Sequence, residues 1–432
     1  MERLLQGWGK LVGGNAANGL LQLMIFAIAS QALDLVSLGM LILIQAFARV
    51  IDGVFNFQSV NVLTHFLAEA DQADDTNRFV ALVKAGLVVD FGSAFLAMAV
   101  AMICLPVVGP LIGLENEWIW LGVAYCAVIA TRVFGAIEAS LRCFDRFGVI
   151  GARPVCASSV ILSASLVAWT QGASAETFLW IWLLGEAIAN LAFLAWSLML
   201  LRSLGVRGLI RANARAAISK SRKFWPMMWQ TNVTFGIRML SQDGDVVVVG
   251  AVLGPAAASL LRAAKNLANI VGQLGRPFQQ VVSAQLTRLV AEGRPQVAYR
   301  QSLSIGGVAG LAALAITLGG LLLGESVLNL LFGPGFNAAA PVLVALLLTA
   351  SLFLFGVASL PLALALDRPD IVLRSTIWGT ISYLIVLFAL IESLALLGVG
   401  LAHIAFNSTW LLFNWLTLRK ATHEVQLQDA KP

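Results

Sequence analysis

The chain is built mainly from long apolar segments, and this feature constrains its fold more than any other. Hydrophobic residues make up 59% of its 432 residues and charged residues only 12%, whereas soluble proteins contain about 25% charged residues. A helix crosses the hydrocarbon core of a bilayer with about 20 apolar residues, and only helices and closed barrels can span it. The sequence therefore predicts an all-α polytopic membrane protein.

We expect about twelve transmembrane helices separated by short polar connections. Their predicted ranges are 13–32, 36–66, 79–104, 118–141, 149–169, 177–201, 226–252, 256–289, 302–324, 337–365, 370–394 and 397–418. Arg3 and Lys10 before the first apolar run resemble the start of a signal peptide. Cleavage is not expected, because the first helix has a counterpart at the start of the second half.

Lysine and arginine are distributed unequally between the two sides of these helices. The connections near 33–35, 105–117, 170–176, 253–255 and 325–336 contain neither residue, whereas the connections at the opposite helix ends are rich in both. The positive-inside rule places the basic side in the cytoplasm, so both termini are expected to be inside. The same rule explains the net charge of +5 without a nucleic-acid partner.

The longest connection, residues 202–225, falls at the midpoint of the predicted helices. It contains no acidic residue and seven cations: Arg202, Arg207, Arg211, Arg215, Lys220, Arg222 and Lys223. We interpret it as a basic cytoplasmic linker that docks on anionic lipid; a regulatory or partner-binding role is the alternative. The expected domains are a six-helix lobe (1–201), this linker (202–225) and a second six-helix lobe with a short cytoplasmic tail (226–432).

The two halves resemble distant copies of each other. The second predicted helix ends in Phe66-Leu67-Ala68-Glu69 and the eighth in Leu289-Val290-Ala291-Glu292. Since each half has an even number of helices, both enter the membrane with the same orientation. The sequence therefore predicts a pseudo-two-fold axis along the membrane normal, as in transporters with parallel repeats.

Four predicted helices have a polar stripe along one face. In the eighth, a 3-4-4-3-4 spacing puts every member on one side, and three cations facing hydrocarbon would cost about 2.5–3.5 kcal/mol each near the bilayer centre. The first, second and seventh helices have similar stripes, so we expect all four to line a central hydrated cavity. The stripes are Arg262, Lys265, Asn269, Gln273, Arg276 and Gln280; Asn15, Asn18 and Gln22; Gln45, Arg49, Asp52, Asn56 and Ser59; and Thr231, Thr234, Arg238, Ser241 and Asp245, beside Gln242 and Asp243.

Depth distinguishes the cations of these stripes. With a rise of about 1.5 Å per residue, Arg49, Arg238 and Arg276 fall near the midplane, where they are candidate substrate-binding residues. Arg262 and Lys265 lie nearer the outer end and can extend toward the interface. The alternative is internal ion pairing, of Arg49 with Asp52 and of Arg238 with Asp243 or Asp245. The polar lining expected beside the cations is Asn15, Asn18, Gln45, Asn56, Asn269 and Gln273.

Further intramembrane charges do not follow a stripe. Arg132, Glu138, Asp90 and Glu186 are expected to form interhelical ion pairs, with a proton or cation relay as the alternative. The carboxylates that could couple H⁺ or Na⁺ to transport are Asp52, Asp90, Asp243 and Asp245. Pro277 removes a backbone hydrogen bond and predicts a hinge in the eighth helix.

No catalytic pattern is present. The chain lacks a nucleophile elbow, a Walker loop and a zinc-protease motif, and its four cysteines and three histidines do not have metal-ligand spacing. The sequence thus predicts neither an enzyme nor a resident cofactor or metal. A membrane glycosyltransferase or ligase is the least favoured alternative, because the outer connections are short.

The pattern resembles the multidrug/oligosaccharidyl-lipid/polysaccharide exporter superfamily, and it is most similar to the O-antigen-type polysaccharide flippase branch. The resemblance rests on two six-helix lobes, on the opening at residues 13–19 (GGNAANG), on the run at residues 242–254 (QDGDVVVVGAVLG), and on the two long helices ending in Ala-Glu.

This resemblance implies two lobes in a V, with the first, second, seventh and eighth helices lining the cavity. It implies an undecaprenyl-pyrophosphate-linked oligosaccharide as substrate, flipped from the inner to the outer leaflet of the bacterial cytoplasmic membrane for surface polysaccharide biosynthesis. Membrane lipids, a glycan polymerase and glycosyltransferases are the expected partners of a monomer. A cation-coupled multidrug exporter and a lipid II flippase are the alternatives within the superfamily.

Overall fold

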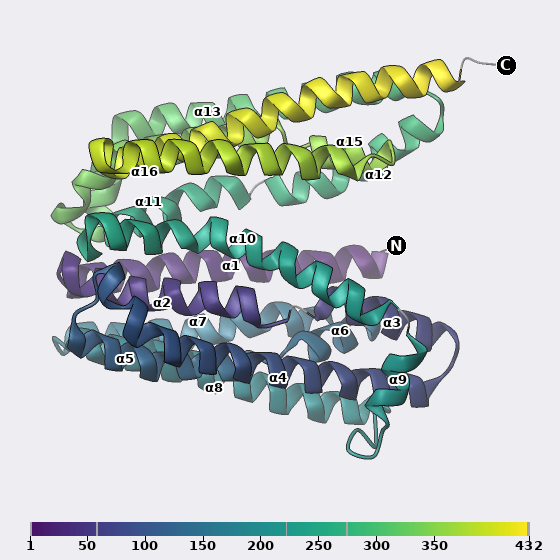
Figure 1. Ribbon diagram of the computed structural model, residues 1–432, viewed down its shortest axis with the longest axis horizontal. Coiled ribbons are helices and arrows are strands. Elements are labelled where there is room, and N and C mark those ends of the chain that lie inside the picture. Colours follow the sequence, from purple (N-terminus) through teal and green to yellow (C-terminus); the bar gives the residue numbers. More distant parts are fainter. Residues whose placement is uncertain (1, 58, 222, 274, 430–432) are drawn as a thin grey trace. The chain divides into compact units, whose positions relative to one another are not determined.

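The computed structural model describes residues 2–57, 59–221, 223–273 and 275–429 (Figure 1). Within these ranges the chain is helical and contains no strand. The elements are α1 (Glu2–Ala32), α2 (Leu35–Phe55), α3 (Val60–Gln72), α4 (Thr76–Val108), η1 (Pro110–Ile112), α5 (Asn116–Cys126), η2 (Ala127–Thr131), α6 (Gly135–Cys143), α7 (Phe147–Thr170), α8 (Ala175–Ser203), α9 (Ala214–Lys220), α10 (Phe224–Leu253), α11 (Pro255–Gln273), α12 (Gly275–Ala291), α13 (Pro295–Phe332), η3 (Pro334–Ala339), α14 (Ala340–Phe355), α15 (Ser359–Ala365) and α16 (Pro369–Asp429).

The predicted ranges correspond closely to these elements, but three predicted helices are not single helices. The range 36–66 is divided into α2 and α3, and 118–141 into α5, η2 and α6. The range 256–289 corresponds to α11 and α12, between which lies only residue 274, outside the described residues. The range 337–365 is divided into η3, α14 and α15. Conversely, the last two predicted helices form α16, which is interrupted at Ala395 by non-helical backbone. The expectation of continuous long helices was therefore wrong for the three divided ranges.

Eight segments of the described chain are long and apolar enough to cross a membrane. They are 35–72, 76–108, 116–143, 147–170, 175–203, 295–332, 334–365 and 369–424. None of them includes α1, α10, α11 or α12. These elements correspond to the first, seventh and eighth predicted helices, which are three of the four with polar stripes. The fold is that of an all-α multi-pass membrane protein, and the number of twelve spans stays a prediction.

The chain divides into two compact units, Met1–Ala258 and Ser259–Pro432. In the first, α1 packs on α7, and α10 packs along α2. In the second, α13 packs on α14, and α14 packs on α16. The division falls within α11, and α10 belongs to the first unit, where it packs along α2. The predicted domains, with a linker at 202–225, stay a prediction. The arrangement as two pseudo-symmetric six-helix lobes stays a prediction.

Small residues set the close approach of helices in the first unit. A side chain at Gly14 of α1 would meet the backbone of Gly151 in α7, at 2.5 Å from its carbonyl oxygen. Similarly, a side chain at Gly39 of α2 would collide with Pro255, and one at Gly250 of α10 would collide with Leu43. Without a strong hydrophobic force between helices in lipid, such backbone proximity is a main source of packing energy.

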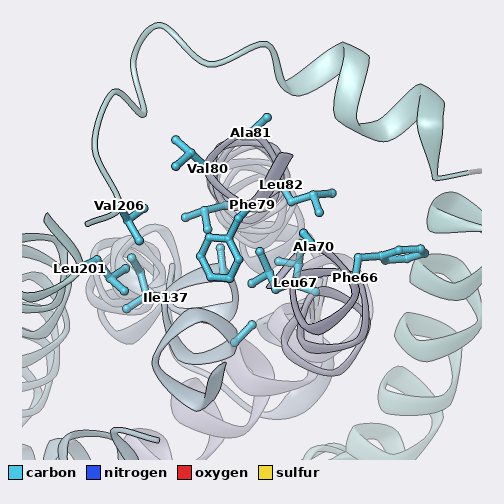
Figure 2. Close-up of a cluster of buried hydrophobic side chains, with 14 of the residues drawn as sticks. Phe66, Leu67, Ala70, Phe79, Val80, Ala81, Leu82, Ile137, Leu201 and Val206 are labelled. Carbon is cyan, nitrogen blue, oxygen red and sulfur yellow. The ribbon is translucent and has the colours of Figure 1, made fainter. Parts of the chain in front are cut away.

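One end of the first unit contains a compact hydrophobic cluster. Its buried side chains come mainly from α3, the start of α4, α6, α8 and the start of α10, with one each from α7, α9 and the connection after α8. The helices α3, α6 and α9 all lie at this end (Figure 1). Figure 2 shows Phe79 and Leu67 in the cluster, with Leu201 and Val206 beside Ile137. The connection from α8 to α10 is therefore packed on protein at Val206.

Candidate functional site

Arg49 of α2 forms an ion pair with Asp243 of α10. The distance from Arg49 Nε to Asp243 Oδ2 is 3.3 Å, and the two side chains are 27% and 11% exposed. Nε does not have hydrogen-bond geometry toward any described group, and the buried Nη2 atom likewise has no hydrogen-bond partner in the described part of the chain. The guanidinium is thus neutralised in charge but not saturated with hydrogen bonds.

The close packing of α2 and α10 fixes this pair. A side chain at Gly53 would collide with Met239, and Gly236 lies against Gly53 and Val54. Asn232 of α10 donates from Nδ2 to the Val54 carbonyl oxygen at 2.9 Å, which pairs a carbonyl near the end of α2. Arg49 and Asp243 are consequently held on two helices that touch along their length.

A second arginine, Arg132, is bound by two carboxylates. Its Nη1 lies 2.9 Å from Asp52 Oδ2, and its Nε and Nη2 lie 2.8 Å and 2.7 Å from Glu186 Oε1. The arginine side chain is only 12% exposed. The pair of Arg49 with Asp52, the alternative to substrate binding, does not form, because Arg132 binds Asp52. The expectation of interhelical pairing for Arg132 and Glu186 is confirmed.

The same region contains the breaks of two helices, whose free backbone groups need partners in a membrane. Asp90 of α4 accepts a hydrogen bond through Oδ2 from the Ala136 N–H, at 2.7 Å, in the first turn of α6. Asn56, between α2 and α3, donates to Asp52 at 2.9 Å and to the Arg132 carbonyl oxygen at 3.4 Å. Asn56 also accepts from the Ser93 hydroxyl at 2.9 Å. Side chains therefore stabilise both breaks.

The other predicted residues of the first unit have diverse surroundings. Asn15 is exposed on α1, and Gln45 is half-buried on α2. Asn18 accepts from the Ser158 hydroxyl of α7 at 2.7 Å, so its carbonyl oxygen is bound to a neighbouring helix. Asp245 is buried, and its Oδ1 accepts from the Val246 N–H at 2.8 Å. Arg238 lies in α10, but its side chain is outside the described residues.

In the second unit, the described part of the predicted stripe lies on α11. Arg262 is half-buried, Lys265 is buried and Asn269 is exposed. The side chains of Gln273, Arg276 and Pro277 are outside the described residues. The backbone of Pro277 is helical and lies within α12. Its role as a hinge stays a prediction, as does a cavity shared by helices of both halves.

Two serines accompany this polar core: Ser59, which belongs to the predicted stripe of the second helix, and Ser93, which sequence reasoning missed. Ser93 joins the Asn56 side chain to the Phe57 N–H, at 2.9 Å and 3.1 Å. Ser59 is fully buried beside Gly135, where a side chain on the glycine would collide with its hydroxyl. Three polar residues among the four positions 56–59, within an otherwise apolar segment, were the available signal for a break. Within the described chain, no three His, Cys, Asp or Glu side chains gather as metal ligands.

No protein-family model matches the chain. The inner membrane protein YghQ of Escherichia coli (strain K12) is 24% identical over 328 residues, which cover 75% of this chain and 90% of that protein. An inward-facing structure of a multidrug resistance MATE family transporter of the MOP superfamily has a TM-score of 0.73 at 15% identity, covering 98% and 96% of the two chains. The chain has the fold of the MATE transporters.

The structure of a flippase is also similar to this chain. The structure of lipid II flippase MurJ in an inward closed conformation has a TM-score of 0.61 at 12% identity, covering 90% of this chain and 89% of that one. The predicted superfamily fold is thereby confirmed. At these identities the similarity concerns the fold, and the polysaccharide branch stays a prediction.

Proposed function

We propose that the protein is a flippase for an anionic lipid-linked oligosaccharide, of the undecaprenyl-pyrophosphate type, in the bacterial inner membrane. The observation that supports this substrate is Arg49, a cation near the predicted midplane whose buried Nη2 is not hydrogen-bonded to any described group. A phosphate oxygen supplies the charge and the acceptors that a guanidinium needs. The MATE and MurJ fold and the similarity to an inner membrane protein support transport and location.

Asp243 has a specific part in this proposal. When substrate is absent, its carboxylate forms an ion pair with Arg49. This pairing lowers the energetic cost of the partly buried guanidinium charge. An entering pyrophosphate displaces it and binds Arg49 between α2 and α10. Exchange of one anion for another avoids an unpaired arginine at any stage, so the site can bind and release its substrate in each cycle of alternating access.

The membrane potential favours movement in the proposed direction. Moving one negative charge outward from a negative cytoplasm gains about 2.3 kcal/mol per 100 mV. A pyrophosphate with about two charges gains roughly twice as much. Coupling to H⁺ or Na⁺ through Asp52, Asp90, Asp243 or Asp245 is compatible with this gain but is not required by it.

A multidrug exporter is the second candidate, since a MATE transporter has the same fold. A cationic drug needs carboxylates that can face it. Asp52 is bound by Arg132, and Asp243 is bound by Arg49, so these two acids are already neutralised. The Arg49 site therefore favours an anionic substrate. A lipid II flippase like MurJ needs the same chemistry and differs from the main proposal in the attached glycan.

The test uses a strain in which surface polysaccharide depends on this protein. Arg49→Ala should reduce surface polysaccharide about tenfold or more, because a charge-assisted hydrogen bond is worth about 1.5–3 kcal/mol, while protein abundance stays unchanged. Arg238→Ala and Arg276→Ala are expected to act similarly.

Arg78→Ala is the matched control. Its side chain is 23% exposed and pairs with Glu69 at 3.2 Å, outside the site. We expect normal polysaccharide in this variant. Normal polysaccharide in all three site variants would contradict the assignment, and drug resistance without any glycan defect would favour the exporter.

A further inference from the structure

The linker between α8 and α10 is a built element with a defined shape. Val206 and Ala217 are each 4% exposed and belong to the hydrophobic cluster, and Figure 2 shows Val206 beside Leu201 and Ile137. Lys84 of α4 donates from Nζ to the Ile210 carbonyl oxygen at 2.6 Å and to the Ala212 carbonyl oxygen at 2.9 Å. These contacts anchor the tip of the linker to the transmembrane bundle.

The backbone of this tip is a closed turn. The N–H groups of Arg211 and Ala212 donate to the Gly208 carbonyl oxygen at 3.0 Å and 3.1 Å. Gly208 has a φ of +78°, a conformation that favours glycine. With both ends of the turn bound, the direction in which its side chains point is fixed by the fold.

At the tip, the Ile210 side chain is 91% exposed. All described cations of the linker are exposed around it, and no acidic residue occurs between 202 and 223. These cations are Arg202, Arg207, Arg211, Arg215, Lys220 and Lys223. An exposed large aliphatic side chain among cations is typical of segments that lie in the headgroup layer of an anionic membrane.

The position of the tip along α4 matches that layer. Lys84 is eight residues from the start of α4 at Thr76, or about 12 Å along the helix axis. The 33 residues of α4 extend about 50 Å, whereas the hydrocarbon core is about 30 Å thick. If the difference is divided evenly, about 10 Å of α4 extends beyond the core at each end, so Lys84 and the tip bound to it lie at the boundary between the core and the headgroup layer. It also follows directly on α8, a candidate span that ends at Ser203.

We propose that this linker binds anionic phospholipid headgroups, with Ile210 inserted into the adjacent leaflet and Arg207 and Arg211 binding phosphates. An acidic protein surface would also suit the cations, but it would leave Ile210 in the headgroup layer without a role. The proposal does not depend on the transported substrate. In this proposal the linker stays attached to the membrane surface while α8 and α10, which it connects, move.

The experiment places a fluorophore at the tip. Ile210→Cys is made in a protein whose Cys104, Cys143 and Cys156 are serine; Cys126 is fully buried and is kept. The cysteine is labelled with an environment-sensitive dye, and the protein is reconstituted in nanodiscs of phosphatidylcholine with or without phosphatidylglycerol. Quenching by lipids brominated near the headgroup is then measured.

We expect quenching at position 210 to be at least about twofold stronger in discs with phosphatidylglycerol, since each cation near an anionic surface favours binding. Arg207→Glu together with Arg211→Glu should abolish this difference. Asp71→Cys is the matched control, because it is exposed at the end of α3, near other acids, and should show little quenching in both lipids. Equal quenching at positions 210 and 71, or no response to phosphatidylglycerol, would overturn the proposal.

Discussion

Arg49 and Arg132 lie in the same unit of the protein, yet their surroundings differ in kind. Three nitrogen atoms of Arg132 contact Asp52 and Glu186 at 2.7–2.9 Å. Arg49 has one ion-pair contact of 3.3 Å and a buried Nη2 without a hydrogen-bond partner among the described residues. The guanidinium of Arg132 is thus saturated with carboxylate contacts, whereas that of Arg49 is not.

The difference separates a structural charge from one that can bind a ligand. Two carboxylates can be removed from a buried arginine only at high cost, so Arg132 is suited to fix helices in place. Its contacts join α2 and α8 at the break before α6. Arg49 is partly exposed, and its guanidinium has N–H groups without hydrogen-bond acceptors. It can therefore bind a new anion, because a phosphate adds hydrogen bonds that Asp243 does not supply.

The largest effect is expected from Arg132→Met. This change leaves the carboxylates of Asp52 and Glu186 without their cation and should destabilise the fold by about 3–5 kcal/mol. Arg49→Met should cost about 1 kcal/mol or less, as for partly exposed pairs. Thermal unfolding in detergent measures both, with the buried Cys126 thiol as reporter.

A compensated variant tests whether charge is the cause. Arg132→Met combined with Asp52→Asn and Glu186→Gln removes all three charges and should recover most of the lost stability. If the single Arg132 variant unfolds at the same temperature as the natural protein, the distinction between the two arginines fails.

An intermediate effect is expected at Asp90, which belongs to the same fixed polar core. Asp90→Ala leaves the buried Ala136 N–H without its acceptor and should cost about 1–3 kcal/mol. Asp90→Asn retains an acceptor oxygen and should cost clearly less. Stability is measured by the same unfolding assay. A stable Asp90→Asn variant that no longer transports would assign its carboxylate to ion coupling and not to support of the helix break.

The helices were predictable because residues close to each helix end determine where the helix begins and ends. Apolar runs give way to charged or turn residues within a few positions, as at Asp34, whose Oδ1 accepts from the Val36 and Ser37 N–H groups and begins α2. The Ser37 hydroxyl and these backbone groups hold the pKa of Asp34 below its ordinary value. Such signals act over two or three residues, so spacing alone reveals them.

The helix breaks and ion-pair partners were not predictable by the same route. The first turn of α6 is paired by Asp90, and Asp52 is bound by Arg132, which is 80 residues away in sequence. Spacing on one helix suggested Arg49 with Asp52, because it can compare only residues on that helix. Tertiary packing decides which of several acids a cation meets. Arg49 meets Asp243 because glycines allow α2 and α10 to pack closely.

The smallest effect, and the most specific to Arg49, is expected from Asp243→Asn. This change removes the carboxylate that competes with an incoming anion while retaining a side chain of similar shape. Affinity for farnesyl pyrophosphate, a soluble probe with the proposed headgroup, should rise about fivefold, equivalent to roughly 1 kcal/mol for a partly exposed pair. Asp71→Asn removes an equal charge from an exposed position on α3 and should leave this affinity unchanged. Titration calorimetry of the purified variants measures both constants. Weaker binding in the Asp243 variant would mean that the carboxylate orients Arg49 for the anion, and exchange of Asp243 for phosphate would have to be abandoned.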